Sequence, residues 1–240
     1  MAEVTAAQLY DYIACPHRVA LDTFGEIAER EEVSPFVRLL WERGSAFERQ
    51  VAETLPEETE VIVDLAGEEK LSRTIEAIAA RRPVIYGGRI ASDGLLGEPD
   101  LLILRGNGYI AADIKSGRGE TGGDEGDYRA LKPHYAVQVA LYTEILEKLG
   151  QSSGRIAEIW DIRGERVPYD FSETRTKTGT ETWWDFYERV RDEVTQILNG
   201  VVETKGALAA ICGLCHWRAK CKTELIGVGD LSLIPALGRA

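Results

Sequence analysis

Three residues that could act together on a phosphate, Asp100, Asp113 and Lys115, lie in a segment that predicts a hairpin of two strands. If Leu104 pairs with Tyr109 across the turn, the antiparallel register places Asp100 directly opposite Asp113. Because side chains alternate along a strand, Lys115 then emerges on the same face as Asp113. Directly opposed residues have Cβ atoms about 5 Å apart, and two carboxylates so placed repel each other unless a cation lies between them. Such oxygen ligands suit Mg²⁺ or Mn²⁺, and a neighbouring lysine suits the charge that develops on a phosphate.

The predicted hairpin consists of a strand over residues 100–104, a Gly/Asn turn over 105–108 and a strand over 109–115. The alternative is a solvated edge hairpin with scattered charges. The apolar residues of the two strands instead indicate a buried hairpin: Leu101 to Leu104, Ile110 and Ile114.

Pro99-Asp100 and the D-x-K sequence from Asp113 to Lys115 resemble the motif of the PD-(D/E)XK nucleases, and the GxPD sequence resembles their RecB-like branch. The resemblance implies a Mg²⁺- or Mn²⁺-dependent deoxyribonuclease, an exonuclease that acts on single-stranded DNA or DNA ends. It also implies that Asp100, Asp113 and the backbone carbonyl of Ile114 hold the metal. Lys115 would position or deprotonate the attacking water and offset charge in the transition state.

A helix predicted from Pro35 to about Leu55 contains Gly44 and Glu48, four residues apart. RecB-like nucleases have a glycine followed four positions later by a histidine or an acid that completes the metal site. The resemblance therefore implies Glu48 as a third metal ligand. An acid stands here where many relatives have histidine, which makes the site all-carboxylate and more suited to Mg²⁺. The alternative is a charge at the edge of the helix that extends into solvent.

A second helix, predicted from Tyr128 to Leu149, places Gln138 and Tyr142 one turn apart on one face. The two residues match the Q-h-x-x-Y motif that RecB-like nucleases place after the lysine. The resemblance implies that both side chains contact the DNA strand at the active site. The alternative is the polar face of an amphipathic helix exposed to water, and this is our interpretation of His134.

The four cysteines of the chain are a second group with ligand chemistry: Cys15, Cys212, Cys215 and Cys221. A cytosolic protein seldom contains structural disulfides, so four such thiols suggest a bound metal. A Cys₄ zinc site is one alternative, although zinc ribbons usually have two C-x-x-C pairs. We interpret His216, inside the C-terminal trio, as a bystander.

One cysteine before the predicted core and three after it resemble the iron–sulfur site of RecB-like nucleases, and Cys15-Pro16 with Arg18 resembles their C-P-x-R start. CRISPR-adaptation nucleases and helicase-nucleases share this arrangement. The resemblance implies a [4Fe–4S] cluster. It also implies an α/β fold of the restriction-endonuclease type: a mixed central sheet of four or five strands flanked by helices, with a cluster-bound helical cap joining the two termini.

Other segments predict the elements that would position these groups. Strands are predicted over residues 60–64, 84–91, 156–162 and 166–170, the last two as a hairpin. Helices are predicted over residues 5–22, interrupted at Cys15-Pro16, and over 68–82 and 181–198. Gly87-Gly88 indicate a bulge or a close approach of the backbone, and residues 118–127 a Gly- and acid-rich loop without EF-hand spacing. Three aromatic residues are interpreted as packing residues: Trp183, Trp184 and Tyr187.

The composition fits one sizeable core, since the chain has 240 residues, 44% of them hydrophobic. The boundaries we expect are an N-terminal segment over 1–34 with the first cysteine, a nuclease core over 35–200, and an iron–sulfur cap and tail over 201–240. The net charge of 28 − 40 = −12 argues against a broad basic surface for nucleic acid. Without a long apolar run or a signal peptide, we expect a soluble cytoplasmic protein without a membrane partner.

The tail over residues 227–240 resembles the start of a helix-hairpin-helix-like segment in longer bacterial RecB-like proteins. The resemblance implies that the chain is the N-terminal part of such a protein, with further domains or partners from a DNA repair or CRISPR-related system. A second functional class is a non-catalytic DNA-binding or scaffold module that keeps the nuclease fold and the cluster. The two opposed acids and the lysine argue against it, because a binding module does not need them.

Overall fold

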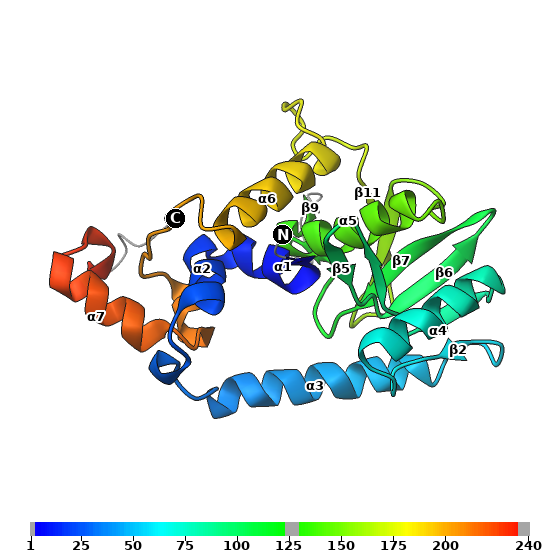
Figure 1. Ribbon diagram of the computed structural model, residues 1–240, viewed down its shortest axis with the longest axis horizontal. Helices are drawn as coiled ribbons and strands as arrows, with labels where there is room; N and C mark the ends of the chain where they lie inside the picture. Colours follow the sequence, from blue (N-terminus) through cyan, green and yellow to red (C-terminus); the bar gives the residue numbers. More distant parts are fainter. Residues whose placement is uncertain (1–2, 123–129, 235–240) are drawn as a thin grey trace.

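The computed structural model describes residues 3–122 and 130–234, and within them a six-stranded mixed sheet in the order β11-β10-β7-β6-β3-β2 (Figure 1). Its strands are β2 (Glu60–Val61), β3 (Val84–Tyr86), β6 (Leu101–Arg105), β7 (Gly108–Ile114), β10 (Ile156–Trp160) and β11 (Arg166–Asp170). The mixed α/β architecture is the one expected, with more strands than the four or five predicted.

The α-helices of the described chain are α1 (Ala6–Ala14), α2 (Pro16–Phe24), α3 (Pro35–Ala52), α4 (Gly67–Ala79), α5 (Pro133–Lys148), α6 (Trp183–Leu198) and α7 (Arg218–Val228). Short 3-10 turns are η1 (Ile27–Glu29), η2 (Ala210–Leu214) and η3 (Leu231–Leu233). A small sheet has the order β1-β5-β4, from β1 (Val4–Thr5), β4 (Ile90–Ser92) and β5 (Leu95–Gly97). In the described part of the chain, no helix combines the length and apolarity needed to cross a membrane.

The hairpin of β6 and β7 lies at the centre of the sheet because both of its faces are covered. Every residue of β7 is buried, which explains its nearly continuous apolar sequence. On one face, Tyr109 and Ala111 belong to the large core that includes the apolar side of α5. On the other face, Ile110 and Ala112 belong to a second core against which Phe47 of α3 packs. The hairpin is therefore fixed between α5 and the C-terminal half of α3 (Figure 1).

The predicted register of the hairpin is confirmed, since Leu104 pairs with Tyr109 and Leu101 with Ala112. One further step of this register brings Asp100 opposite Asp113, and the backbone N–H of Asp100 donates to Oδ1 of Asp113 at 3.3 Å. β6 begins and ends one residue later than predicted, and β7 begins and ends one residue earlier.

The prediction of one continuous strand over residues 84–91 is wrong. β3 ends at Tyr86, and β4 belongs to the separate small sheet. The cause is Gly87, which has a positive φ of 71° and whose added Cβ would overlap Cγ1 of Val63. The glycine pair thus marks a close backbone approach, one of the two alternatives expected, and it ends the strand. The strand predicted over 60–64 is likewise reduced to β2.

The predicted start of the second helix is also wrong within the described residues. Ala130 and Leu131 form β9, which pairs with β8 (Glu120–Thr121), and α5 begins at Pro133. Proline suits the first turn of a helix because it has no N–H, and it holds the preceding residue extended. Tyr128 lies outside the described residues, as do residues 123–127 of the predicted loop and 235–240 of the tail.

The other predicted elements are confirmed. The N-terminal helix is interrupted at Cys15, which separates α1 from α2, and β10 and β11 form the late antiparallel hairpin. Thr182 caps α6 in a capping box with Asp185. The aromatic residues at the start of α6 are packing residues as interpreted, because all three are buried: Trp183, Trp184 and Tyr187.

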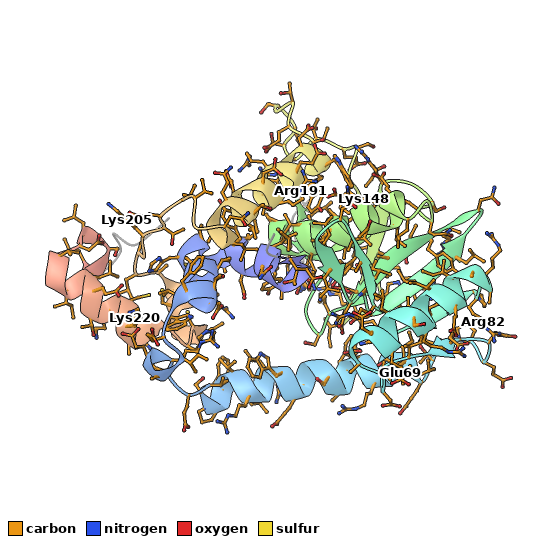
Figure 2. All side chains as sticks on the ribbon, in the orientation of Figure 1. Glu69, Arg82, Lys148, Arg191, Lys205 and Lys220 are labelled. Atoms are coloured by element: carbon orange, nitrogen blue, oxygen red, sulfur yellow. The ribbon has the colours of Figure 1, made fainter. Side chains whose placement is uncertain are left out.

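A helical cap joins the two ends of the described chain through side-chain contacts. Trp217, 0% exposed, donates its Nε1–H to Oδ1 of Asp22 at 2.9 Å. Nε2 of His216 lies 2.7 Å from the same oxygen, so His216 takes part in the contact between α2 and the C-terminal segment. Lys220 lies on α7 (Figure 2), and its Nζ donates to Oε2 of Glu29 at 2.7 Å. Burial raises the pKa of Asp22, but the hydrogen bonds from Trp217 and His216 outweigh it and lower the pKa overall.

Candidate functional site

Asp100, Asp113 and Lys115 are brought together at the open end of the β6–β7 hairpin. Asp113 is 1% exposed, and its Oδ2 accepts a hydrogen bond from Nζ of Lys115 at 2.8 Å. Oδ2 of Asp100 accepts the backbone N–H of Ile114 at 2.6 Å. Asp113 thus lies at the end of β7 opposite Asp100, which directly precedes β6, and Lys115 forms an ion pair with Asp113.

Burial and neighbouring charges shift the pKa values of Asp100 and Lys115. Burial raises the pKa of Asp100 well above its ordinary value, and the neighbouring Asp113 and Glu48 raise it further. Lys115 and the N–H of Ile114 act in the opposite direction. For Lys115, burial lowers the pKa, but Asp113 and Asp100 outweigh it and raise the pKa overall. The metal-free site therefore holds a charged Lys115, and the Asp100 carboxyl retains its proton above the usual pH range.

We predict that Asp100→Asn stabilises the metal-free protein at neutral pH. A carboxyl group with a raised pKa in the folded state contributes full stability below its unfolded pKa of about 4, and that contribution is lost as the pH rises through the folded pKa. The amide remains uncharged and still accepts the N–H of Ile114. We expect a gain on the order of 1 kcal/mol or more at pH 7, since a tenfold change in an acid dissociation constant corresponds to about 1.4 kcal/mol.

Thermal unfolding of wild type and Asp100→Asn between pH 4 and 8, in EDTA, measures this difference. The gap in the free energy of unfolding should widen as the pH rises. A gap that is constant with pH would show that Asp100 does not carry a raised pKa.

Glu48 approaches the hairpin from α3. An added Cβ on Gly44 would lie 3.8 Å from Oγ of Ser116, so this part of the helix lies beside the residue that follows Lys115. The Glu48 carboxylate accepts a hydrogen bond from the phenol of Tyr86 at 3.1 Å. Burial, followed by the charge of Glu48, raises the pKa of Tyr86 to about 12, so the phenol keeps its proton.

Tyr86 is a site residue that the sequence reasoning missed. It comes from β3, and the strand alternation that places Val84 and Tyr86 on one face was the available signal. That face is the one covered by α3. Tyr86 is positioned to orient Glu48, as outer hydrogen-bond partners orient the ligands of metal sites.

Gln138 and Tyr142 lie one turn apart on α5, as predicted, and Nε2 of Gln138 donates to the Tyr142 phenol at 3.3 Å. Oε1 of Gln138 is buried without a hydrogen-bond partner among the described residues. Tyr142 is 2% exposed, and its O–H donates to the backbone oxygen of Glu98 at 3.4 Å. An added Cβ on Gly97 would overlap the Tyr142 ring, so packing against Tyr142 requires a glycine at this position of the GxPD sequence.

A second missed residue, Tyr135, faces the lysine of the site. Nζ of Lys115 lies 5.7 Å from the centre of its ring, within the range of a cation–π contact. His134 packs edge-on against Tyr135 and Tyr10, so it is not a fully solvated residue. Burial, followed by Lys132 and Lys115, lowers the pKa of His134 to about 4, and the imidazole is neutral at physiological pH.

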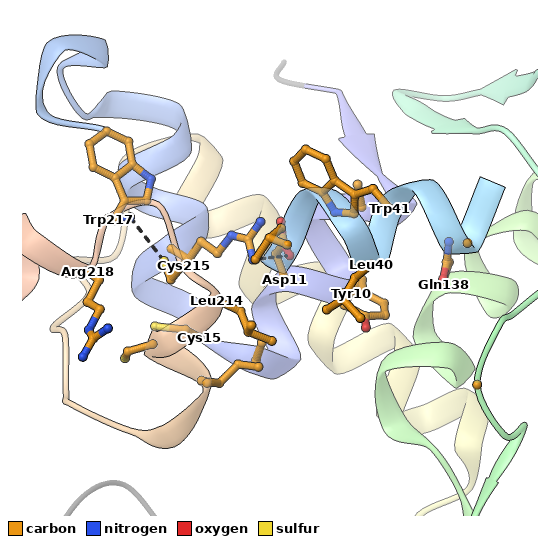
Figure 3. A pocket seen from close by; sticks show the side chains of 18 of the residues that line it. Tyr10, Asp11, Cys15, Leu40, Trp41, Gln138, Leu214, Cys215, Trp217 and Arg218 are labelled. Carbon is orange, nitrogen blue, oxygen red and sulfur yellow. Dashed lines mark hydrogen bonds and ion pairs between the residues drawn. The ribbon is translucent and has the colours of Figure 1, made fainter. Parts of the chain in front are cut away.

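One cavity of about 730 Å³ contains both groups of candidate residues. Glu48, Asp100, Ile114, Lys115 and Gln138 line one part of it. The four cysteines line the other part, toward the cap, where Figure 3 shows Cys15 and Cys215. Asp113 and Tyr142 are not among its lining residues; they lie behind Lys115 and Gln138.

The cysteine side chains are free thiols, all four of them partly buried. Burial raises the pKa of Cys221 to about 11, and charge on Cys215 and Cys15 raises it further. The pKa of Cys215 is raised for the same reasons, against a hydrogen bond from the N–H of Trp217. Thiols that disfavour one another's ionisation are stabilised as thiolates by a cationic centre, so the chemistry of these donors suits a metal or an iron–sulfur cluster, and their role as ligands stays a prediction.

In residues 3–122 and 130–234, no group of three or more His, Cys, Asp or Glu side chains is arranged so that it could hold a metal ion. The three predicted carboxylate ligands instead have separate partners: Asp113 bonds Lys115, Asp100 bonds the Ile114 N–H, and Glu48 bonds Tyr86. Their chemistry fits Mg²⁺ or Mn²⁺, since these are oxygen donors whose mutual repulsion a cation would remove. Their role as ligands stays a prediction.

Comparison with known proteins covers most of the chain. The family model described as the PD-(D/E)XK nuclease superfamily matches residues 4–222. No curated protein matches the sequence. Ten chains of solved structures match, including the crystal structure of SSO0001, at 12% identity and a TM-score of 0.32, over 78% of this chain and 96% of that one. Members of this superfamily are typically phosphodiesterase nucleases that use divalent metals such as Mg²⁺ or Mn²⁺. The match includes the hairpin acids, the lysine and all four cysteines, and the chain belongs to the PD-(D/E)XK nuclease superfamily.

Proposed function

We propose that the protein is a RecB-like deoxyribonuclease that uses Mg²⁺ or Mn²⁺ to hydrolyse phosphodiester bonds of single-stranded DNA or DNA ends. The observation that carries this proposal is the register of the central hairpin, which opposes Asp100 and Asp113 and places Lys115 beside them. A structural ion pair needs one acid for one lysine, whereas this site has three acids near a single lysine. Such an excess of negative charge suits a bound divalent cation.

Asp100, Asp113, Glu48 and the carbonyl of Ile114 would hold the cation. When bound, it supplies charge stabilisation for the phosphate and a more acidic water. Lys115 is protonated in the metal-free protein because the two aspartates raise its pKa, so its first role is to offset charge on the phosphate. It can accept a proton from water only when the charge of the aspartates is neutralised.

Gln138 would contact the DNA strand directly, because it lines the cavity and has an unpartnered buried oxygen. Tyr142 would act through Gln138, since its phenol bonds that side chain and its ring is buried. In this assignment Gln138 binds the strand and Tyr142 is a positioning residue.

Cleavage of end-labelled linear DNA and of circular single-stranded DNA tests the proposal. Wild-type protein should degrade the linear strand with Mg²⁺ or Mn²⁺ and do nothing in EDTA. Degradation of linear DNA alone would establish an exonuclease. A protein that cleaves neither substrate with either metal would refute the nuclease proposal and leave a binding or scaffold module.

We predict that Glu48 is a direct metal ligand, because it borders the cavity beside Asp100 and already pairs with a hydrogen-bond donor that can orient it. Glu48→Gln should weaken Mn²⁺ affinity about 10-fold or more, as titration of the metal-free protein measures. Glu42→Gln is the matched control, since Glu42 is exposed on the same helix and does not line the cavity. Equal affinities for the two variants would remove Glu48 from the site.

We also propose that Cys15, Cys212, Cys215 and Cys221 hold a [4Fe–4S] cluster. All four line one cavity and influence one another electrostatically, while no three are arranged around a single ion within the described residues. The same four thiolates would also suit one tetrahedral zinc ion, so a Cys₄ zinc site is the alternative that metal analysis of the purified protein must distinguish.

The cellular setting that we propose follows from this chemistry. Unpaired thiols and an iron–sulfur cluster suit a reducing compartment, which supports a cytoplasmic location. The acidic net charge of −12 supports cooperation with further domains or with partners of a DNA repair or CRISPR-related system. These would supply positive charge for the DNA backbone in addition to that of this acidic chain.

A further inference from the structure

Trp41 on α3 differs from the other tryptophans of the chain, all five of which lie within the described residues. It is 61% exposed, whereas Trp183, Trp184 and Trp217 are buried. Trp160 is partly buried, and its ring lies under Arg166 at 4.1 Å. An exposed tryptophan is a large apolar surface without a partner in the chain, which is typical of a residue that contacts a ligand.

The exposed ring of Trp41 belongs to the cavity that contains the candidate catalytic residues. One face of α3 lines this cavity, at positions three or four residues apart: Val37, Leu40, Trp41, Gly44, Ser45 and Glu48. Tyr10 lines it from α1, and Figure 3 shows Tyr10 and Trp41 on these two helices. No residue of α3 is fully buried, so the helix presents this face to the cavity rather than to a core.

We propose that Trp41 is a stacking site for an unpaired nucleobase of the strand whose phosphate reaches Asp100, Asp113 and Lys115. This inference rests on the proposed nuclease function and specifies how the substrate is held. A base paired within a duplex has both faces covered by its neighbours, so a tryptophan can stack only on an unpaired one. Stacking on an aromatic side chain is tolerant of sequence, because every base has a π-face.

The position of Trp41 also sets which nucleotide it contacts. Trp41 and Glu48 are seven residues apart on one helix, or about 10 Å along its axis at 1.5 Å per residue. A stacked strand advances by roughly 3.4 Å per nucleotide. The base on Trp41 therefore lies about three nucleotides from the phosphate at the carboxylates.

Two arginines that line the same cavities as Trp41 supply positive charge for a bound strand. Arg18 and Arg218 line both this cavity and the smaller adjoining cavity of about 130 Å³ that Trp41 also lines. Their guanidinium groups can offset the backbone charge of a bound strand. Asp11 pairs with Arg18 at 3.1 Å, so Arg218 is the better candidate for this role.

Binding of a fluorescein-labelled 12-nucleotide oligodeoxythymidine, measured in EDTA so that no strand is cut, tests the inference. Trp41→Ala should raise the Kd about 5- to 100-fold, and Trp41→Phe should keep most of the affinity. Phe36→Ala is the matched control, because Phe36 is 59% exposed on the same helix but does not line the cavity. It should change the Kd less than twofold, and thermal unfolding should be the same for all three variants.

Oligonucleotides with one abasic site at successive positions locate the contact. In wild type, one position about three nucleotides from the cleaved bond should weaken binding, and Trp41→Ala should abolish that sensitivity. A Trp41→Ala variant that binds like Phe36→Ala, or equal losses at all abasic positions, would refute the stacking site. A cleavage assay distinguishes failure of the stacking site from failure of the nuclease function. If wild type cleaves DNA with a metal and Trp41→Ala binds the oligonucleotide as tightly as wild type, only the stacking site is refuted. If wild type cleaves no DNA, the nuclease function is refuted.

Discussion

Asp113→Asn is expected to lower the rate of DNA cleavage about 10³-fold or more, a loss of roughly 4 kcal/mol of transition-state stabilisation. Asp113 is buried, opposes Asp100 and holds Lys115 at 2.8 Å, so the change removes the charge of a proposed metal ligand and also frees the lysine. Rates measured at saturating Mn²⁺ under single-turnover conditions give the effect on chemistry. The fold should persist, because asparagine keeps the size of the side chain.

Asp161→Asn is the matched control for a buried aspartate outside the site. Asp161 is 3% exposed and accepts backbone N–H groups of Gly119, Arg163 and Glu165, so its replacement should reduce stability but spare catalysis. Lys115→Met should lose as much activity as Asp113→Asn and should also destabilise the protein at neutral pH, because two acids then lack a cation. Asp113→Asn that cleaves as fast as wild type would show that the active site lies elsewhere.

The second large effect concerns the cysteines. Anaerobically purified protein is expected to be brown, with broad absorbance near about 400 nm from the cluster. Cys15→Ala should lose this colour and unfold at a lower temperature. Cys15 and Cys212 enclose 196 residues, and closing a loop of this order corresponds to roughly 5 kcal/mol if the metal link restricts the unfolded chain as a disulfide does.

The loss of stability in Cys15→Ala should be concentrated in the two ends of the chain, and hydrogen exchange can measure this. The N-terminal helices and the segment after residue 200 should lose protection first, while the central hairpin keeps it. Contacts of Trp217 with Asp22 and of Lys220 with Glu29 will hold part of the cap without the cluster. A colourless protein with one zinc per chain would contradict the iron assignment, and full stability with all four cysteines changed to alanine would contradict any structural metal.

The sequence was most informative where chemistry depends on local spacing. The turn between Leu104 and Tyr109 determines the register of the hairpin, and this register alone brings Asp100 opposite Asp113. The break at Cys15-Pro16 follows in the same way from the geometry of proline. Spacing of four residues on α5 similarly placed Gln138 beside Tyr142.

Contacts between distant segments could not be read from such spacing. Tyr86 and Glu48 meet only because α3 crosses the face of β3, and Gly97 fits only because Tyr142 packs against it. The end of strand β3 before Gly87 depends on the close approach of Val63, which is distant in sequence. The single cavity that joins the carboxylates to the cysteines is likewise a result of packing α1, α3 and the C-terminal segment around one space.

The location of Mn²⁺ in crystals of the protein, found by anomalous diffraction, tests the central claim most directly. We expect an anomalous peak within roughly 2.5 Å of carboxylate oxygens of both Asp100 and Asp113, close enough for coordination. Asp113→Asn crystals under the same conditions should lose this peak. A protein that cleaves DNA in the presence of Mn²⁺, but whose bound Mn²⁺ lies away from both aspartates, would contradict the account.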